Sequence, residues 1–227
     1  MRVLAFESSA RAASVAYCRD GELIASAFQA SGLTHSRTLL PMAQALLANA
    51  DLSMDDVDLL AVAHGPGSFT GLRIGVSLVK GLAFARDLPC VGVSTLEALA
   101  NCMPRQDAVL CAVMDARAGQ VYQANFDLSG ENPVRLCADR AVTVAQLSEE
   151  LPVLGRRILL AGDGAHLLKN AGEPAPENLR LQNAYGVARL AVRVYTEKGD
   201  FTAAALRPEY LRLPQAERER LKKLGEV

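Results

Sequence analysis

The spacing of apolar and polar residues predicts a βββαβα order of elements in the first part of the chain. Apolar runs bounded by turn residues predict strands at residues 2–6, 13–18, 22–28, 58–64 and 89–93. Helical spacing predicts helices at residues 34–50 and 72–86, each apolar over a broad face. Pro41 falls inside the first of these helices and removes a backbone donor there. Ser94 begins a further short helix, and Glu97 three residues later completes the pattern of a capping box.

The second half of the chain repeats this order of elements. Strands are predicted at residues 108–115, 120–128, 134–138 and 158–161, and helices at residues 143–151 and 184–197. Because βββαβα occurs twice, we expect a two-lobed α/β protein built from duplicated units. We place the first lobe at residues 1–102 and the second at residues 103–227, with the last helix of the chain packing back on the first lobe. The charged tail after Pro214 predicts a short solvated helix or a frayed end.

A glycine-rich connection, Gly65–Gly71 (GPGSFTG), joins a buried strand to the following helix. A helix start offers free N–H groups, and glycine lets a ligand approach the backbone closely, so this connection is a candidate site for phosphate or carboxylate. The alternative is a tight strand-to-helix connection that Ser68 or Thr70 caps. Leu-Arg follows Gly71, which excludes a Walker loop. Asp87 precedes the next strand instead of ending it, which excludes the dinucleotide fingerprint.

A second polar segment, Glu7-Ser8-Ser9, ends the first strand. Its carboxylate and hydroxyls could approach the phosphates of a nucleotide or a magnesium ion, but a turn that satisfies its own backbone fits equally well. The tentative nucleotide contacts are Ser8, Ser9, Gly65, Gly67, Ser68 and Thr70. The three histidines lie far apart in sequence, and neither HExxH nor GxSxG occurs. We therefore expect no catalytic residue and no metal ligand in this chain.

Composition and charge narrow the class of protein. The 227 residues are 50% hydrophobic, which excludes a disordered chain. The 24 Lys and Arg residues balance 25 Asp and Glu residues, so the chain is not expected to bind nucleic acid alone. Five cysteines without a CxxC pair favour a reducing compartment. No apolar stretch approaches the ~18 residues of a membrane span, and the start lacks the pattern of a signal peptide, so we expect a cytoplasmic protein.

The two predicted helices at residues 34–50 and 72–86 are apolar on more than one face. One face can pack on the sheet and the other can be buried against another protein, or both helices can belong entirely to the core. The residues expected at such an interface are Leu39, Leu40, Ala43, Leu47, Gly71, Gly75, Val76 and Val79.

Several segments spread over residues 3 to about 213 carry a family resemblance. They are LAFESSARAASVAY, THSRTLLP, VAHGPGSFTGLRIGVSLVKGLA, VGVSTLEALA, VMDARAGQVYQA and RPEYLR. With them the sequence resembles the TsaB (YeaZ) family, a bacterial branch of the actin-like ATPase (ASKHA) superfamily, and GPGSFTGLRIG is the most specific block. The family pattern has Asp-Thr-Ser where this chain has Glu7-Ser8-Ser9, a departure that argues against a metal role for that turn.

The resemblance implies a two-lobed actin-like fold and a non-catalytic subunit. Such a subunit binds and activates the TsaD threonylcarbamoyltransferase, which forms N6-threonylcarbamoyladenosine beside the anticodon of tRNAs that read ANN codons. TsaD holds a metal with two histidines of an HMEGH motif, and those positions fall on Thr95 and Leu99 here, neither of which can replace an imidazole. The implied partners are TsaD in a heterodimer, TsaE in a ternary complex, and a second copy of the chain in isolation. No cofactor is required, and ATP or ADP would bind weakly or at the subunit interface.

Two enzyme classes remain as alternatives at this point. A stand-alone phosphotransferase or ATPase of the same fold would use Ser8, Ser9 and the glycine-rich connection. A metalloprotease would need a bound transition metal, against which the missing histidine cluster argues. Contact with tRNA is expected to be mainly indirect, through the partner, and any direct contact to lie at a local basic patch. The candidates for that patch are Arg207, Arg212, Arg218, Arg220, Lys222 and Lys223.

Overall fold

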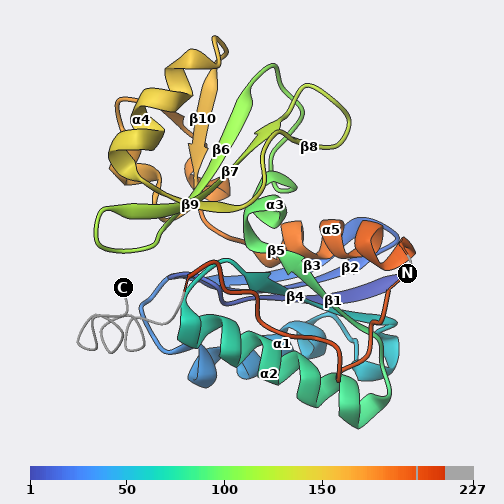
Figure 1. Cartoon of the computed structure of the whole chain (residues 1–227). Helices are drawn as coiled ribbons and strands as arrows, with labels where there is room; N and C mark the ends of the chain where they lie inside the picture. Colours follow the sequence, from blue (N-terminus) through green and yellow to red (C-terminus); the bar gives the residue numbers. More distant parts are fainter. Residues whose placement is uncertain (198, 213–227) are drawn as a thin grey trace, which may run out of the picture.

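The computed structural model describes residues 1–197 and 199–212, and these form two lobes that each contain one β-sheet (Figure 1). The first sheet has the order β3-β2-β1-β4-β5. Its strands are β1 (Arg2–Glu7), β2 (Ala13–Arg19), β3 (Glu22–Gln29), β4 (Leu59–Gly65) and β5 (Cys90–Ser94). The first three strands are antiparallel neighbours, whereas β4 runs parallel to both β1 and β5. This parallel part is buried on both faces, which explains why β4 reads as a continuous apolar run.

Helices cover both faces of the first sheet. Helices α1 (His35–Asn49) and α2 (Phe69–Arg86) lie on one face, and α5 (Ala184–Thr196) lies on the other (Figure 1). Pro41 does not interrupt α1 and lies on the exposed side of the helix. A short 3-10 helix, Met54–Asp56, leads into β4.

The second sheet repeats the strand order of the first, which confirms the two-lobed α/β fold of duplicated units that the sequence predicts. Its order is β11-β10-β6-β7-β8, and β9 also pairs with β7. The strands are β6 (Val109–Asp115), β7 (Gln120–Asp127), β8 (Val134–Arg135), β9 (Arg140–Thr143), β10 (Ile158–Ala161) and β11 (Glu173–Pro174). Helix α4 (Val144–Val153) packs on this sheet together with the 3-10 helix Ala165–Leu168, and a further 3-10 helix spans Glu177–Leu179.

Two helices lie between the sheets and join the lobes. Helix α3 (Thr95–Ala100) contributes Leu96 and Leu99 to a core that it shares with the second sheet, and it also packs on α5. Helix α5 follows the second sheet in sequence but packs on the first sheet. Helix α5 therefore completes the first lobe, and α3 contributes to the core of the second.

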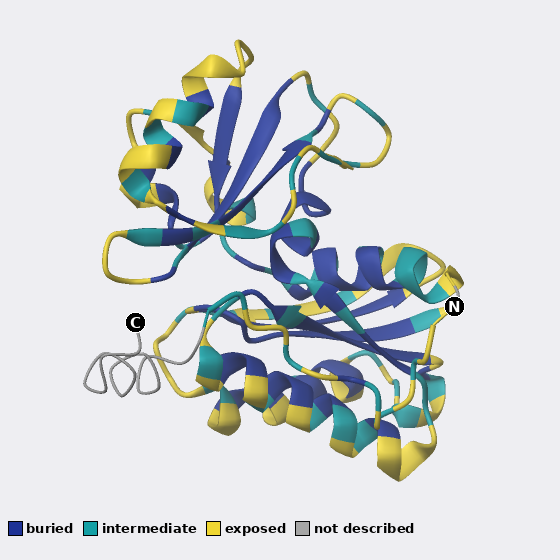
Figure 2. Cartoon of the chain, in the orientation of Figure 1, coloured by how far each residue is buried: buried dark blue, intermediate teal, exposed yellow. Residues whose placement is uncertain are grey.

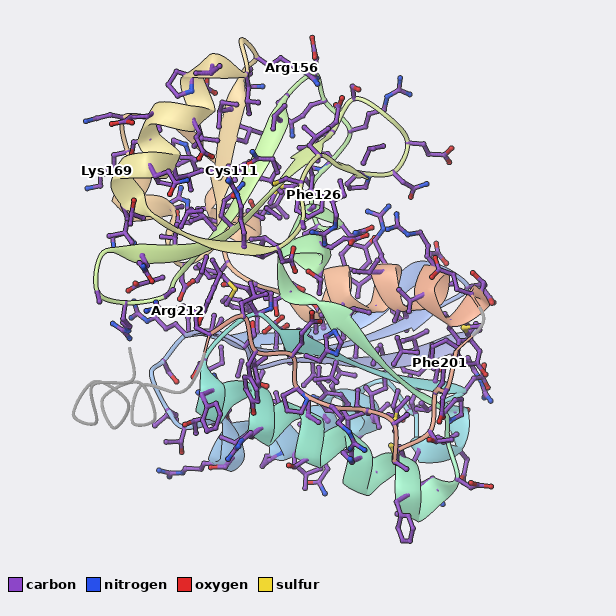
Figure 3. All side chains as sticks on the ribbon, viewed as in Figure 1. Cys111, Phe126, Arg156, Lys169, Phe201 and Arg212 are labelled. Atoms are coloured by element: carbon purple, nitrogen blue, oxygen red, sulfur yellow. The ribbon has the colours of Figure 1, made fainter. Side chains whose placement is uncertain are left out.

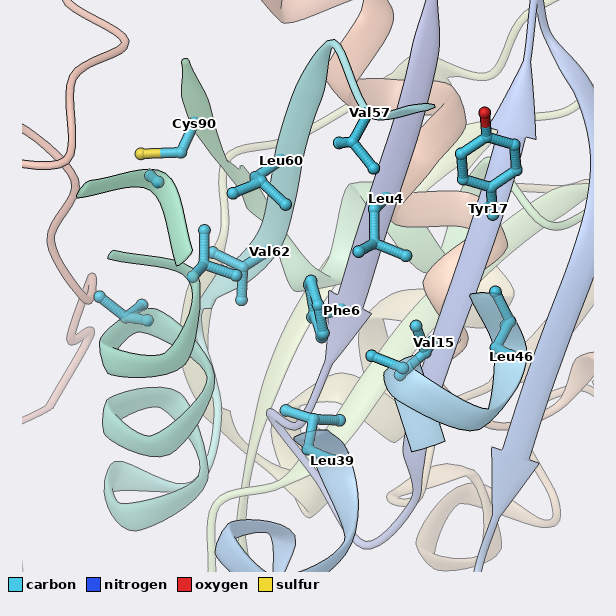
Figure 4. Packing of buried hydrophobic residues seen from close by; sticks show 14 of the residues in the cluster. Leu4, Phe6, Val15, Tyr17, Leu39, Leu46, Val57, Leu60, Val62 and Cys90 are labelled. Carbon is cyan, nitrogen blue, oxygen red and sulfur yellow. The ribbon is translucent and has the colours of Figure 1, made fainter. Parts of the chain in front are cut away.

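Burial is concentrated in the sheets and on the inner sides of the helices (Figure 2). Between α1 and the first sheet, Phe6 and Tyr17 pack against Leu39 and Leu46, as Figure 4 shows. Tyr17 also donates a hydrogen bond to the carbonyl oxygen of Asp56 at 2.7 Å, so its buried hydroxyl is satisfied.

The structure corrects two local predictions. The strand predicted at residues 134–138 is reduced to β8, and β9 begins only at Arg140; the side chains of Arg135 and Asp139 bond to Ser94 of the first lobe. The predicted capping box is also wrong. Ser94 Oγ does accept from the N–H of Glu97, but the Glu97 carboxylate binds arginines instead of the backbone of Ser94.

Candidate functional site

The glycine-rich connection between β4 and α2 packs tightly against the turn after β1. The N–H of Ser68 donates to the carbonyl oxygen of Ser9 at 2.7 Å, and Ser8 Oγ donates to the carbonyl oxygen of Gly71 at 2.9 Å. A Cβ atom on Gly67 would overlap Ser9, and one on Gly71 would overlap the backbone of Ser8. These glycines therefore permit a close approach between two segments of this chain.

The C-terminal end of the described chain covers the start of this connection. The N–H of Glu209 donates to the carbonyl oxygen of His64 at 2.7 Å, and a Cβ atom on Gly65 would overlap the carbonyl oxygen of Glu209. His64 Nδ1 lies 3.2 Å from the carbonyl oxygen of Arg207, so this nitrogen carries the hydrogen. Burial lowers the pKa of His64. Residues 206–212 thus form a strap over the end of β4, a role that the RPEYLR motif alone did not reveal.

A cleft of about 870 Å³ lies between the two lobes, next to the glycine-rich connection between β4 and α2. The turn after β1, the start of α2, the β6–β7 turn and the strap line its walls. Four of the six tentative nucleotide contacts line this cleft, namely Ser9, Gly67, Ser68 and Thr70. The other two, Ser8 and Gly65, are buried behind them and are not part of its lining.

Two acidic side chains lie at the cleft: Glu7 is buried beside it, and Asp163 is partly buried in its lining. Glu7 Oε1 accepts from the N–H of Ser9 at 2.6 Å, whereas Glu7 Oε2 has no hydrogen-bond partner within residues 1–197 and 199–212. Burial raises the pKa of Glu7 to about 7, with a smaller contribution from the charge of Asp163. Burial likewise raises the pKa of Asp163, which accepts from Gln182 Nε2 at 3.3 Å. The carboxyl group of Glu7 therefore keeps its proton up to a higher pH than an ordinary glutamate does.

Metal ligation finds no support in this part of the molecule. No group of three or more His, Cys, Asp or Glu side chains that could hold a metal ion occurs among the described residues. His35 and His166 line the cleft, and each contacts a backbone carbonyl oxygen at 2.8 Å. Thr95 and Leu99, at the positions that the resemblance assigns to histidines, are fully buried in α3. The side chains at these two positions offer no nitrogen to a metal.

A second hollow lies on the outer side of the first lobe, between α1 and α2. It measures about 600 Å³, and most of its lining is apolar. The lining residues are His35, Ser36, Leu39, Leu40, Phe69, Thr70, Arg73, Ile74, Ser77 and Leu78. We call this hollow, together with the exposed sides of α1 and α2 around it, the helix-pair surface.

The burial of α1 and α2 bears on the interface that the sequence predicts, which stays a prediction. Seven of the eight predicted residues are buried, because they point toward the first sheet and its core. They are Leu39, Ala43, Leu47, Gly71, Gly75, Val76 and Val79. Only Leu40 is exposed, at 39%. The most apolar residues of these helices mark the core, whereas the helix-pair surface consists of Leu40 and partly exposed neighbours such as Ile74, Ser77 and Leu78.

An ionic network between the lobes was not predicted from the sequence, because its members come from three distant segments. Glu97 on α3 accepts from Arg135 of the second lobe at 2.8 Å and from Arg193 of α5 at 2.9 Å. Arg135 also pairs with Asp139, and Ser94 Oγ donates to Asp139 at 2.6 Å. These side chains are largely shielded from water, and the network links the two lobes.

None of the described helices has the length and apolar character needed to span a bilayer.

Comparisons with known proteins agree with the geometry. The family model described as "TsaD: tRNA N6-adenosine threonylcarbamoyltransferase" matches residues 29–163. The chain is 31% identical over 228 residues to the tRNA threonylcarbamoyladenosine biosynthesis protein TsaB of Bacillus subtilis (strain 168), covering 96% of each chain. It is 41% identical over 128 residues to the protein of the same name from Escherichia coli (strain K12), an alignment over 56% of this chain and 55% of that protein.

A solved structure extends this agreement to three dimensions. YeaZ from Pseudomonas aeruginosa superposes with a TM-score of 0.80 and 28% identity, covering 92% of this chain and 99% of that one. Sequence similarity over nearly the full length therefore coincides with the same arrangement of two lobes. The chain belongs to the TsaB family.

Proposed function

We propose that this protein is a non-catalytic subunit that binds and activates a TsaD-type transferase in forming N6-threonylcarbamoyladenosine on tRNA. The names of its relatives place the family in this pathway. The observation that carries the non-catalytic role is the burial of Thr95 and Leu99 in α3, at the positions where the transferase holds its metal with histidines. Without imidazoles there, the reaction must take place on the partner.

The helix-pair surface is the proposed docking site for that partner. Leu40 and Ile74 line its hollow, and Ser77 and Gly81 place small residues one turn apart on α2. A Cβ atom on Gly81 would meet nothing within 4 Å, so another helix can approach closely there. Farther along α2, Phe84 is 87% exposed, which is costly for a large aromatic side chain unless a partner covers it.

The transferase shares the family model that matches this chain, so a related helix pair on TsaD is the proposed occupant. In isolation a second copy of this chain would occupy the same surface, in a symmetric homodimer. TsaE would join the heterodimer as a third subunit, and the complex would work in the cytoplasm.

We propose further that the chain needs no nucleotide of its own. The strap covers Gly65, and the backbones of Ser8 and Ser9 fill the space beside Gly67 and Gly71. The hydroxyl of Ser9, with Ser68 and Thr70, would hold the phosphates of ATP or ADP only weakly.

A charge on the helix-pair surface tests the docking site. We expect Leu40→Arg to weaken binding of the cognate TsaD by at least tenfold in titration calorimetry, because a charge would be buried against an apolar partner. Leu23→Arg on β3 is the matched control, since Leu23 is 42% exposed and Leu40 is 39% exposed. Equal binding by the two variants would remove the helix-pair surface from the interface.

Reconstituted modification tests the role itself. Unmodified tRNA is incubated with the threonylcarbamoyl adenylate, TsaD and TsaE, with and without this chain, and the modified nucleoside is measured by mass spectrometry. We expect formation of the nucleoside to depend on the chain and to be lost with Leu40→Arg. Equal yield without the chain would contradict the proposed function. Turnover of ATP by the chain alone would favour the phosphotransferase alternative instead.

A further inference from the structure

Three arginines from distant parts of the sequence lie at the mouth of the cleft between the lobes. Arg11 follows the turn after β1, Arg117 belongs to the β6–β7 turn, and Arg212 ends the strap. All three line the cleft, and Figure 3 shows Arg212 between the two lobes. Arg212 donates to the carbonyl oxygen of Ala116 at 3.1 Å, which fixes the end of the strap beside the β6–β7 turn.

These arginines lack the close carboxylate pairs that seven other arginines of the described residues form. Neither Arg11 nor Arg212 pairs with a carboxylate of residues 1–197 or 199–212, and Arg117 pairs only with Asp115, at 3.6 Å and with its side chain 84% exposed. The arginines that do form closer carboxylate pairs are Arg2, Arg86, Arg135, Arg140, Arg156, Arg157 and Arg193. The guanidinium groups at the cleft therefore have donors available to a ligand.

The acidic residues of the cleft offset only part of this charge. Among the described residues, Asp115 and Asp163 are the two acidic residues that line it, against three arginines, and burial raises the pKa of Asp163. The first turn of α2, which also lines the cleft, contains no acidic residue, and its N-terminal end adds positive potential. The mouth of the cleft is thus a local basic surface on a chain whose net charge is −1.

The basic surface is continuous with the helix-pair surface. His35, Phe69, Thr70 and Ile74 line both the cleft and the hollow between α1 and α2. A transferase bound to the helix pair would therefore stand next to the three arginines. An RNA substrate held by that transferase could extend across them without leaving the complex.

We propose that Arg11, Arg117 and Arg212 bind the phosphodiester backbone of the tRNA while it is held by the assembled complex. This proposal rests on the proposed function, because the chain alone is too weakly basic to retain RNA. Guanidinium groups suit phosphates, since their N–H donors can contact two oxygens at once. Such contacts position the RNA without reading its sequence.

The test measures binding of unmodified tRNA to the assembled complex by fluorescence anisotropy over a range of salt concentrations. We expect the variant Arg11→Gln/Arg117→Gln/Arg212→Gln to bind tRNA at least about tenfold more weakly, and the slope of log affinity against log salt to fall by about one per arginine removed. The control Arg86→Gln/Arg156→Gln/Arg157→Gln removes the same charge from arginines that are paired with carboxylates. It should leave both the affinity and the slope close to those of the wild type.

Binding of the partner is measured in parallel and separates the two proposals. The triple variant should still bind TsaD, since none of its arginines lines the hollow of the helix-pair surface. Because Arg212 also bonds to Ala116, the double variant Arg11→Gln/Arg117→Gln serves as a check that leaves the strap intact. Unchanged tRNA affinity and slope in either variant, with the complex assembled, would overturn the RNA contact. Normal tRNA binding with lost affinity for ADP would also overturn it and assign the cleft to a nucleotide.

Discussion

The buried carboxyl group of Glu7 makes the stability of this protein depend on pH in a direction that can be calculated. Its pKa is about 7 in the folded protein, against 4.5 as the ordinary value. Below pH 4.5 both states hold the proton, so the group has no effect. Between pH 4.5 and about 7 the unfolded chain releases the proton while the folded chain keeps it, so the free energy of unfolding falls as pH rises. At about 1.4 kcal/mol per unit, the full loss is about 3 kcal/mol above pH 7.

Glu7→Gln removes this dependence while keeping the shape of the side chain. The amide oxygen can still accept from the N–H of Ser9, and the amide cannot ionise at any of these pH values. Its NH₂ group takes the place of Glu7 Oε2, which lacks a partner in the described chain, and leaving that group unpaired costs about 1–3 kcal/mol at every pH. The informative quantity is therefore the change with pH in the difference between the two proteins.

Urea unfolding followed by circular dichroism measures this change. Relative to the wild type, the variant should gain about 3 kcal/mol between about pH 4.5 and about pH 8. Contributions from Asp163 and His64 are present in both proteins and cancel in the difference to first order. Two curves that stay parallel over this range would show that Glu7 titrates normally in the folded state, and the argument from burial would be refuted.

Two further predictions concern packing and the contact between the lobes. Gly71→Ala should lower the free energy of unfolding by about 2 kcal/mol or more, because its Cβ would overlap the backbone of Ser8, whereas Gly81→Ala has open space and should raise it by about 0.5–1 kcal/mol. Urea titration of both variants checks this, and equal effects would contradict the close approach at Gly71. Glu97→Gln should cost about 1–3 kcal/mol, because Arg135 and Arg193 lose a charged partner in a shielded contact. A thermal midpoint equal to that of the wild type would show that the network does not hold the lobes together.

Most of the fold could be predicted because it depends on local patterns. Apolar runs identified the strands of the first sheet and β6, β7 and β10 of the second, whereas β9 and β11 were not predicted. Ser68, Ser94 and Thr143 cap the helices α2, α3 and α4. The prediction failed at residues 134–138, where composition favours a strand. There only β8, Val134–Arg135, forms, and the side chains of Arg135 and Asp139 bond across to the other lobe.

The candidate site was only partly predictable. Ser9, Gly67, Ser68 and Thr70 do lie together on the cleft, because they end two adjacent parallel strands or begin the helix that follows one of them. Seven of the eight expected interface residues are buried, since the apolar side of a helix packs first on the sheet, and their part in an interface stays a prediction. Arg218, Arg220, Lys222 and Lys223 lie outside the described residues, so that part of the predicted basic patch stays a prediction.

The amino-acid sequence by itself determined the order of elements, the family and the absence of histidines at Thr95 and Leu99, because these depend on residue identity and short-range spacing. Only the tertiary structure decided which residues face a partner, what the glycines of GPGSFTG contact, and which charges meet. Arg11, Arg117 and Arg212 are about 100 residues apart from one to the next along the chain, and packing of the two lobes brings them to one cleft. Burial depends in the same way on the whole fold, and it sets the proton affinity of Glu7, which no local pattern encodes.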